Sequence, residues 1–262
     1  MRDGGHPDWL VPEWPATGVG AVMTTRRGGA SVPPFDSLNL RGGIGDDAQH
    51  VRHNLQVLAR AIDAVPVCLD QVHGAAVVRL ARADAEPGAP LHTADASVTT
   101  EPGIACTVQV ADCLPVLFAA PGGRAVGAAH AGWRGLALGV LEATATAVCE
   151  AAGCRPDELH AWLGACIGPG RFEVGRDVLE AFGVDPAHPS TVFAPAFMPI
   201  APGKWLADLP MLARSRLQRA GVQSIGGGAW CTVSSPSRFF SFRRDRVTGR
   251  MAAAVWIEGG GD

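Results

Sequence analysis

The clearest hydrophobic pattern in the chain is a helical stripe that follows residue 46. Its members fall at positions i, i+4, i+7 and i+11: Val51, Leu55, Leu58 and Ile62. Asp46 and Gln49 precede and enter this stripe at positions that resemble a capping box, in which a side chain accepts a hydrogen bond from a backbone N–H at the helix start. The pattern predicts an amphipathic helix that opens at Asp46.

Shorter apolar runs bounded by turn-forming residues are typical of buried strands. We expect strands at residues 19–25, 65–69, 75–80, 104–110, 116–118, 125–128, 239–243 and 251–257. A second helix is predicted over residues 135–152 and closed by Gly153, and a third from Asp208, with Pro210 in its first turn, to Gly221. The proline-rich residues 187–203 indicate an excursion over the surface.

Strands and helices interleave without regular β–α–β units, which favours a mixed sheet over a doubly wound parallel one. We therefore expect an α/β (α+β) fold in which residues 1–262 form a single domain with a mixed sheet and flanking helices. With 47% hydrophobic and 18% charged residues, the composition is that of a globular chain and not of a disordered one.

Charge and composition exclude several functions. The formal net charge of −3 provides no basic field for a phosphate backbone, so we expect no nucleic-acid partner. Lys204 is the single lysine, tyrosine is absent, and no phosphate-cradling GxxxxGK[ST] loop occurs. Catalysis must then depend on His, Cys, Asp, Glu, Arg or a metal.

The seven cysteines are odd in number and contain no C-x-x-C pair, and the sequence opens with MRDGGHPDWL, which is not a charged and then apolar leader. This usage predicts a protein of the reducing cytoplasm. The longest apolar stretches, residues 104–120 and 125–141, are interrupted by charged residues, proline or histidine, so we expect no membrane span.

Three segments each place one candidate metal ligand in a turn after an apolar run: His73 in QVHG, Cys113 in ADCLP and His130 in AHAGWRG. A catalytic zinc ion takes three such ligands and keeps a fourth position open. Their separations are too long for a local finger motif, so the residues alone indicate a constellation and not a motif. As an alternative, a cysteine between apolar strands is usually inert, and this interpretation covers Cys68, Cys106, Cys149 and Cys231.

The remaining candidates carry weaker signals. His50 and His53 share one helix face, as a metal pair or as a solvated pair would. Arg134 stands at a predicted helix N-terminus, where the helix dipole disfavours a cation, which hints at contact with an anion. Residues 41–45 (RGGIG) resemble a phosphate nest, although Asp46 and Asp47 would repel the anion.

Together these segments resemble the YfiH, or laccase-domain, family, whose members have been called polyphenol oxidases and purine nucleoside phosphorylases with adenosine deaminase activity. The matching stretches run in order over nearly the whole chain: TTRRGG, SLNL, GDD, QVHG, ADA, ADCLPVLF, AAHAGWRG, IGPGRFEVG, DLP, CTVSS and FFSFRRDRVTGRMAA. HAGWRG and ADCLP are its most specific parts.

The resemblance implies that His73, Cys113 and His130 are zinc ligands, with copper as the alternative metal. It implies a mixed α/β architecture related to the cysteine-hydrolase fold of the bacterial CNF toxin. Asn39, Arg134 and Arg243 match motif positions and become candidate substrate-binding residues. The sequence departs from the family at Gly170-Arg171-Phe172, where relatives carry Cys-Cys-Tyr, at Phe242, where a tyrosine is expected, and at Gly42-Gly43.

Three enzymatic functions remain open. The first is a zinc enzyme that acts on purine nucleosides (adenosine, inosine, methylthioadenosine) with phosphate or water, with Cys113, His130 and Asp112 as its catalytic residues. Asp112 would transfer a proton or hold a neighbouring group. The H-x-E…P-C-x-x-C signature of nucleobase deaminases is missing, so deamination would use an independent arrangement.

The second function is a copper-dependent polyphenol oxidase, although the sequence contains no H-x-H pair. The third is a Cys–His amidohydrolase that edits misincorporated peptidoglycan precursors, with Cys113 as nucleophile and His130 as base. A metal-stabilised binding module is a fourth, non-enzymatic alternative. Three ligands argue against it, because structural zinc sites usually have four.

Overall fold

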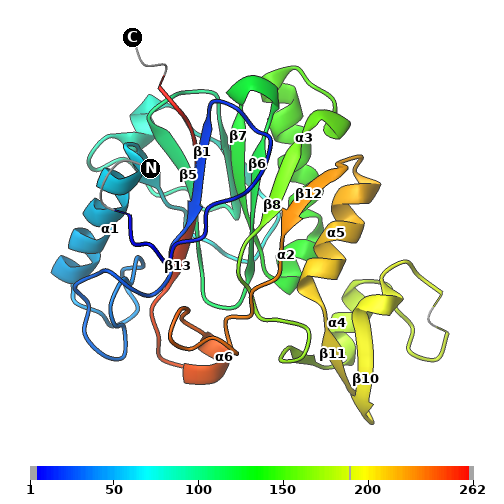
Figure 1. The fold of residues 1–262 in the computed structure, drawn as a ribbon. Helices are drawn as coiled ribbons and strands as arrows, with labels where there is room; N and C mark the ends of the chain where they lie inside the picture. Colours follow the sequence, from blue (N-terminus) through cyan, green and yellow to red (C-terminus); the bar gives the residue numbers. More distant parts are fainter. Residues whose placement is uncertain (1–4, 189, 260–262) are drawn as a thin grey trace.

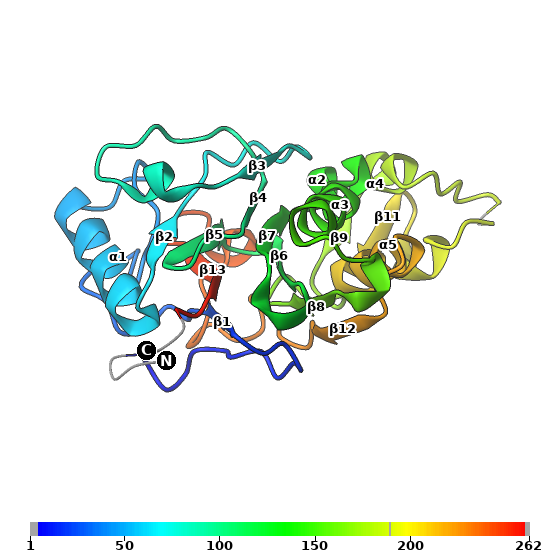
Figure 2. The same cartoon turned by 90° about the horizontal axis from the view of Figure 1, so that it is seen from above.

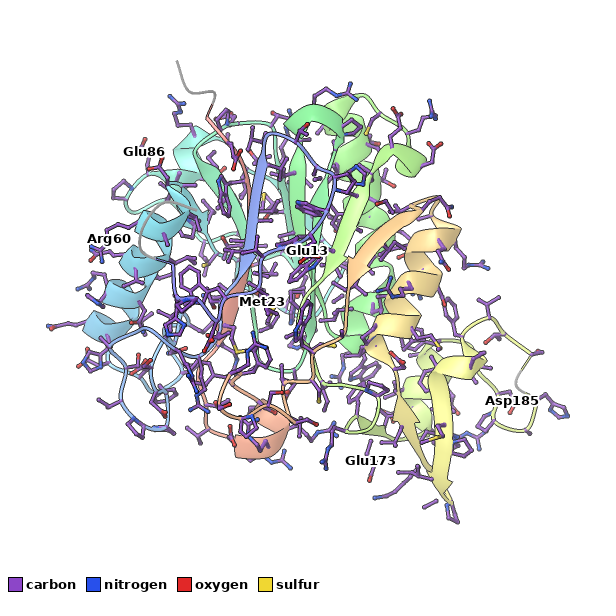
Figure 3. The ribbon with its side chains drawn as sticks, in the orientation of Figure 1. Glu13, Met23, Arg60, Glu86, Glu173 and Asp185 are labelled. Atoms are coloured by element: carbon purple, nitrogen blue, oxygen red, sulfur yellow. The ribbon has the colours of Figure 1, made fainter. Side chains whose placement is uncertain are left out.

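A computed structural model describes residues 5–188 and 190–259 as four stacked layers, with a helix, two sheets and then further helices (Figure 2). Three clusters of buried apolar residues fill the spaces between the layers. Met23, at the centre of Figure 3, lies fully buried between the two sheets. The mixed α/β architecture predicted from the sequence is confirmed.

The first sheet has four strands in the order β1–β13–β5–β2, of which only β2 and β5 run parallel. The strands are β1 (Val19–Met23), β2 (Val65–Val67), β5 (Ile104–Val110) and β13 (Met251–Ile257). Helix α1 (Ala48–Ile62) covers its outer face. The buried face of α1 carries Val51, Leu58 and Ile62, as the stripe predicted.

The helix begins one residue later than the capping pattern indicated. Asp47, not Asp46, accepts the hydrogen bond from the backbone N–H of Gln49. Asp46 instead accepts hydrogen bonds from the side chains of Ser31 and Asn39.

The second sheet has six strands in the order β12–β8–β6–β7–β4–β3, with parallel pairs at its two edges. The strands are β3 (Val77–Arg79), β4 (Ala96–Thr99), β6 (Leu114–Ala119), β7 (Val126–Ala131), β8 (His160–Leu163) and β12 (Ser224–Gly227). The short strands β4, β8 and β12 were not predicted.

Helices α3 (Val140–Ala152) and α5 (Leu209–Arg219) lie on the outer face of the second sheet (Figure 1). The single helix expected over residues 135–152 is wrong, since the chain forms α2 (Trp133–Leu138) and then α3. Gly139 separates them at a φ of +93°, in the left-handed region that glycine tolerates best. The predicted caps Gly153 and Asp208 are confirmed, and the Asp208 side chain accepts from the backbone N–H of Met211 at 2.8 Å.

The strand expected at residues 239–243 is also wrong. Phe239 and Phe240 are buried, and the chain then turns into the short helix α6 (Phe242–Asp245). The reason is local, because the Ser241 hydroxyl accepts from the backbone N–H of Arg244 and caps this helix.

A small three-stranded sheet, in the order β10–β11–β9, lies at one end of the molecule beside α4 (Arg176–Ala181) (Figure 1). It consists of β9 (Glu173–Val174), β10 (Phe197–Ala201) and β11 (Lys204–Ala207). The excursion expected at residues 187–203 therefore contains β10. No helix in residues 5–188 and 190–259 is long and apolar enough to cross a membrane.

Candidate metal centre

The three candidate ligands come from places where the chain ends a strand or passes between the two large sheets. His73 lies in the crossing from β2 to β3, and Cys113 lies in the crossing from β5 to β6. His130 is the penultimate residue of β7, next to β6 in the second sheet. The topology thus brings together residues that are far apart in the sequence.

One ligand atom from each of His73, Cys113 and His130 lies within 4.8 Å of the other two. His73 Nε2 is 3.8 Å from Cys113 Sγ, and the two imidazole rings meet edge to face at 4.9 Å. His130 is buried, Cys113 is half-buried and His73 is exposed. The cluster therefore has one buried side and one side that faces solvent.

Asp95, which directly precedes β4, binds the side chain of one of the three candidate ligands and the backbone of another. One of its oxygens, Oδ1, lies 2.8 Å from His130 Nδ1 and accepts from the backbone N–H of His73 at 2.9 Å. The other oxygen accepts from the N–H groups of Val72 and Gly74 at 3.1 and 2.6 Å. Asp95 is fully buried, so its charge is stabilised entirely by these four donors.

These bonds explain the backbone around His73. His73 has a φ of +63°, an uncommon left-handed conformation for a residue other than glycine. The Asp95 carboxylate stabilises this turn because it accepts from three successive N–H groups. It also binds His130 Nδ1, which leaves His130 Nε2 free to bind a metal.

The charged groups in the cluster shift one another's pKa values. Burial raises the pKa of the Cys113 thiol, but His130 and His73 outweigh burial and lower that pKa to about 6. Burial lowers the pKa of His130, whereas Cys113 and Asp95 raise it to about 9. Cys113 and His130 therefore each favour the charged form of the other, a thiolate beside an imidazolium, and a metal cation would take the place of the imidazolium proton.

Asp112 precedes Cys113 but directs its carboxylate to other partners. Its oxygens accept from the Thr232 hydroxyl at 2.5 Å and from the backbone N–H of Arg243 at 2.6 Å. Its backbone oxygen accepts from the N–H of Ile167. Asp112 therefore ties the turn that carries Cys113 to three other segments of the chain.

The cluster opens into a cavity of about 350 Å³. The cavity wall includes both imidazoles and Cys113, two glutamines (Gln71 and Gln109), two arginines (Arg41 and Arg250) and the ring of Phe242. Phe242 is 48% exposed and offers an aromatic surface at the opening. A small molecule in this cavity would contact the cluster, positive charge and an aromatic ring together.

The structure places the three substrate-binding candidates outside the cavity wall. Asn39 is fully buried, and its side chain binds Asp46 and the backbone of Arg41 and Arg250. The Arg134 guanidinium stacks on the Trp133 ring at 4.3 Å. Arg243 stacks on Phe172 and donates to the backbone oxygen of Glu173, at the lower end of Figure 3.

Sequence reasoning missed Asp95 and Arg250 and gave Arg41 only a weak signal in the possible nest. Asp95 stood in a matched motif (ADA), but no pattern gave it a role. His50 and His53 do not belong to a group of three close ligands in residues 5–188 and 190–259.

Comparisons with known proteins identify the family to which this chain belongs. The sequence profile described as multi-copper polyphenol oxidoreductase laccase matches residues 20–258. A purine nucleoside phosphorylase of Pseudomonas aeruginosa is 47% identical over 251 residues, which cover 95% of this chain and 98% of that protein. The purine nucleoside phosphorylase YfiH of Escherichia coli is 47% identical over 252 residues, with the same coverage of both chains.

Two crystal structures are similar over nearly the whole chain. A Neisseria meningitidis protein has a TM-score of 0.87 at 45% identity and covers 96% of this chain and 100% of its own. YlmD from Geobacillus stearothermophilus has a TM-score of 0.87 at 32% identity and covers 96% of both chains. With the same layers and a matching profile, this chain belongs to the YfiH family, the family described as multi-copper polyphenol oxidoreductase laccase.

Proposed function

We propose that this protein is a zinc-dependent purine nucleoside phosphorylase that also deaminates adenosine. The observation that carries the proposal is the convergence of His73, Cys113 and His130 at a cavity large enough for a small molecule. The names of the relatives, purine nucleoside phosphorylases at 47% identity, supply the reaction class. The seven free cysteines agree with a reducing compartment, the cytoplasm.

The donor set fits zinc. Two imidazoles and one thiolate are ordinary zinc ligands, and Asp95 presents His130 in the orientation that metal-bound histidines usually have. The 3.8 Å between His73 Nε2 and Cys113 Sγ is shorter than the sum of a Zn–N bond of about 2.0 Å and a Zn–S bond of about 2.3 Å, so both atoms can reach one ion. Zinc with three protein ligands supplies a Lewis acid with an open coordination position.

In phosphorolysis, a phosphate oxygen forms a bond to C1′ of the ribose while the C1′–N9 bond breaks. The purine leaves with the bonding electrons and takes up the proton that the attacking hydrogen phosphate gives up. In deamination, water replaces the 6-amino group of adenosine, which leaves as ammonia. In both reactions His73, Cys113 and His130 would hold the metal, and Phe242 would offer a stacking surface for the base. Asp112 positions the turn of Cys113, because both of its oxygens are already hydrogen-bonded.

Product analysis tests this proposal. The zinc-loaded protein is incubated with inosine or adenosine, with and without phosphate, and the base, ribose 1-phosphate and ammonia are measured. We expect equal amounts of base and ribose 1-phosphate only with phosphate, and inosine plus ammonia from adenosine without it. His73→Ala should lose both activities, and His53→Ala, on the exposed face of α1, should keep them.

Two results would overturn the proposal. One is the absence of all these products from protein that elemental analysis shows to contain zinc. The other is full turnover after complete removal of metal. Elemental analysis of the purified protein also separates zinc from copper, since two histidines and one cysteine are the equatorial ligands of mononuclear copper sites too.

A second candidate function rests on the alignment of Cys113, His130 and Asp95. In this order Cys113, His130 and the buried Asp95 would supply the nucleophile, the acid–base group and the orienting carboxylate of a cysteine amidohydrolase. Cys113 Sγ would attack an amide carbonyl, His130 would protonate the leaving amine, and water would hydrolyse the thioester. Cleavage of a peptidoglycan-precursor amide by metal-free protein, abolished by alkylation of Cys113, would favour this function over the first.

Polyphenol oxidation by several copper ions receives no support from the ligand geometry. His73, Cys113 and His130 form the one group of three close metal-ligating side chains in the part of the chain that the structure describes. The profile name alone points to that activity.

A further inference from the structure

The cavity beside the metal ligands has two arginines on its wall, which come from opposite ends of the chain. Arg41 follows the buried residues Leu38, Asn39 and Leu40, and Arg250 directly precedes β13. Both are half-buried, and both line the cavity together with His73, Cys113 and His130. Two cations therefore face the same small volume as the candidate metal.

Asn39 holds the two arginines side by side. Its Oδ1 accepts from the backbone N–H of Arg41 at 3.1 Å and from the backbone N–H of Arg250 at 2.9 Å. Its Nδ2 donates to the Arg41 backbone oxygen and to Asp46, and Leu40 N–H donates to the Arg250 backbone oxygen. Because Asn39 is fully buried, this arrangement is a fixed part of the fold.

Other contacts orient the guanidinium groups. Arg41 donates to Gln109 Oε1 at 3.2 Å and approaches the carboxylate of Asp70 at 3.9 Å. Arg250 donates through one nitrogen, Nη1, to the backbone oxygens of Thr248 and Gly249. Among the ion pairs of residues 5–188 and 190–259, none joins Arg250 to a carboxylate.

The positive charge at this place is therefore incompletely balanced. Burial and the charge of Arg41 lower the pKa of Arg250, while Cys113 and Asp112 act in the opposite direction. Two guanidinium groups with spare N–H donors bind a tetrahedral oxyanion well, because each can donate two parallel hydrogen bonds to it. A bound anion would also relieve the repulsion between the arginines.

We propose that Arg41 and Arg250 form a binding subsite for a phosphate group next to the metal ligands, with Asn39 as the residue that positions both arginines. The phosphate has two possible sources, inorganic phosphate as co-substrate or the phosphate of a phosphorylated nucleoside. The first source rests on the proposed phosphorolysis. The subsite itself rests on the cavity and on the hydrogen bonds of Asn39.

Calorimetric titration of the zinc-loaded protein tests the subsite. The ligands are inorganic phosphate, adenosine 5′-monophosphate and adenosine. The variants are Arg41→Gln and Arg250→Gln, with Arg52→Gln on the exposed face of α1 as the control. We expect each cavity variant to raise the Kd for phosphate at least tenfold, and the control to leave it unchanged. Circular dichroism and zinc content show whether each variant is folded.

The two sources give different results. If inorganic phosphate is the ligand, it binds in the subsite, and the protein binds adenosine 5′-monophosphate no more tightly than adenosine. If a phosphorylated nucleoside is the ligand, the monophosphate binds more tightly than adenosine, and both arginine variants remove that difference. Folded, zinc-containing variants that bind both phosphate ligands as tightly as the parent would overturn the proposal, as would a parent that binds neither.

Kinetics separates this proposal from the proposed function. Phosphorolysis with an unchanged KM for phosphate in both variants would leave the function standing and refute inorganic phosphate as the ligand of the subsite. Phosphate binding that depends on Arg41 and Arg250 in a protein without phosphorolysis would support the subsite and refute the proposed function. Asn39→Ala should weaken phosphate binding although its side chain does not line the cavity, and Arg41→Lys should restore part of the affinity lost in Arg41→Gln.

Discussion

Replacement of Asp95 by asparagine should damage the candidate metal centre without replacing any of its three ligands. Each carboxylate oxygen serves two donors, Oδ1 for His73 N–H and His130 Nδ1 and Oδ2 for Val72 N–H and Gly74 N–H. An asparagine offers one oxygen and one NH2 group. In either orientation of the amide, one pair of donors faces another donor, and the turn of His73 loses part of its support.

The magnitude follows from these contacts. Two buried donors without acceptors cost about 1–3 kcal/mol each, and removal of one partner from a buried ion pair costs about 3–5 kcal/mol. A loss of about 3 kcal/mol corresponds to a fall in Tm of roughly 6–12 °C for a chain of this size. Loss of a carboxylate behind a metal-binding histidine typically weakens metal affinity about 10–100-fold.

Cobalt titration measures the effect directly, because the visible bands and the thiolate charge-transfer band of Co²⁺ report the number and type of ligands. We expect Asp95→Asn to need 10–100-fold more free Co²⁺ for half-saturation, in line with the typical effect of such a partner. Glu150→Gln, which removes a charge from the exposed side of α3, is the control. Unchanged cobalt affinity and spectra in folded Asp95→Asn would refute the role given to this carboxylate.

Three further predictions concern single residues. Gly132→Ala should weaken cobalt binding, because the alanine Cβ would lie 2.9 Å from Cys113 Sγ and 3.1 Å from a His73 ring carbon. Gly170→Ala is the control, because no atom lies within 4 Å of the added Cβ. Equal cobalt affinities of the two variants would contradict this prediction. Gly139→Ala should destabilise the protein by about 1–2 kcal/mol in urea because of its positive φ, and an unchanged midpoint would show that the break between α2 and α3 tolerates a side chain. For Cys231, burial raises the pKa of the thiol, but hydrogen bonds from Ser234, Gly168 and Val233 outweigh burial and lower it. Its thiolate therefore persists to lower pH than that of an ordinary cysteine and is lost as pH falls through the lowered pKa. Mass-spectrometric alkylation rates should show this, with the profile shifted to higher pH in Ser234→Ala; identical profiles would count against it.

The sequence predicted the parts of the fold that strong local patterns determine. Helix α1 and the caps Asp208 and Gly153 depend on neighbouring residues, so periodicity and capping chemistry find them. Residues 239–243 look like a strand because they are apolar, and only the Ser241 cap distinguishes them from one. The short strands β4, β8 and β12 depend on partners far away in the chain, which a local pattern does not contain.

The same division applies to the site. The sequence alone could identify His73, Cys113 and His130, because each is a metal-binding residue type in a turn after an apolar run. Asp95 and Arg250 act through contacts with residues far away in sequence, such as Asp95 with His130 and Arg250 with Asn39. Their chemistry is visible only when the two sheets are in place.

Two of the three candidate ligands lie where the chain crosses from one large sheet to the other, so a metal bound there would help to hold the sheets together. His73 and Cys113 each lie on such a crossing, and His130 is the penultimate residue of β7 in the second sheet. An ion bound by all three side chains would connect the two large sheets. Metal binding and the folding stability of the protein would then be thermodynamically linked. With free metal at 1,000 times its dissociation constant, this linkage adds about 4.1 kcal/mol to the folded state. A low concentration of the ion would thus shorten the lifetime of the folded protein as well as lower its catalytic activity.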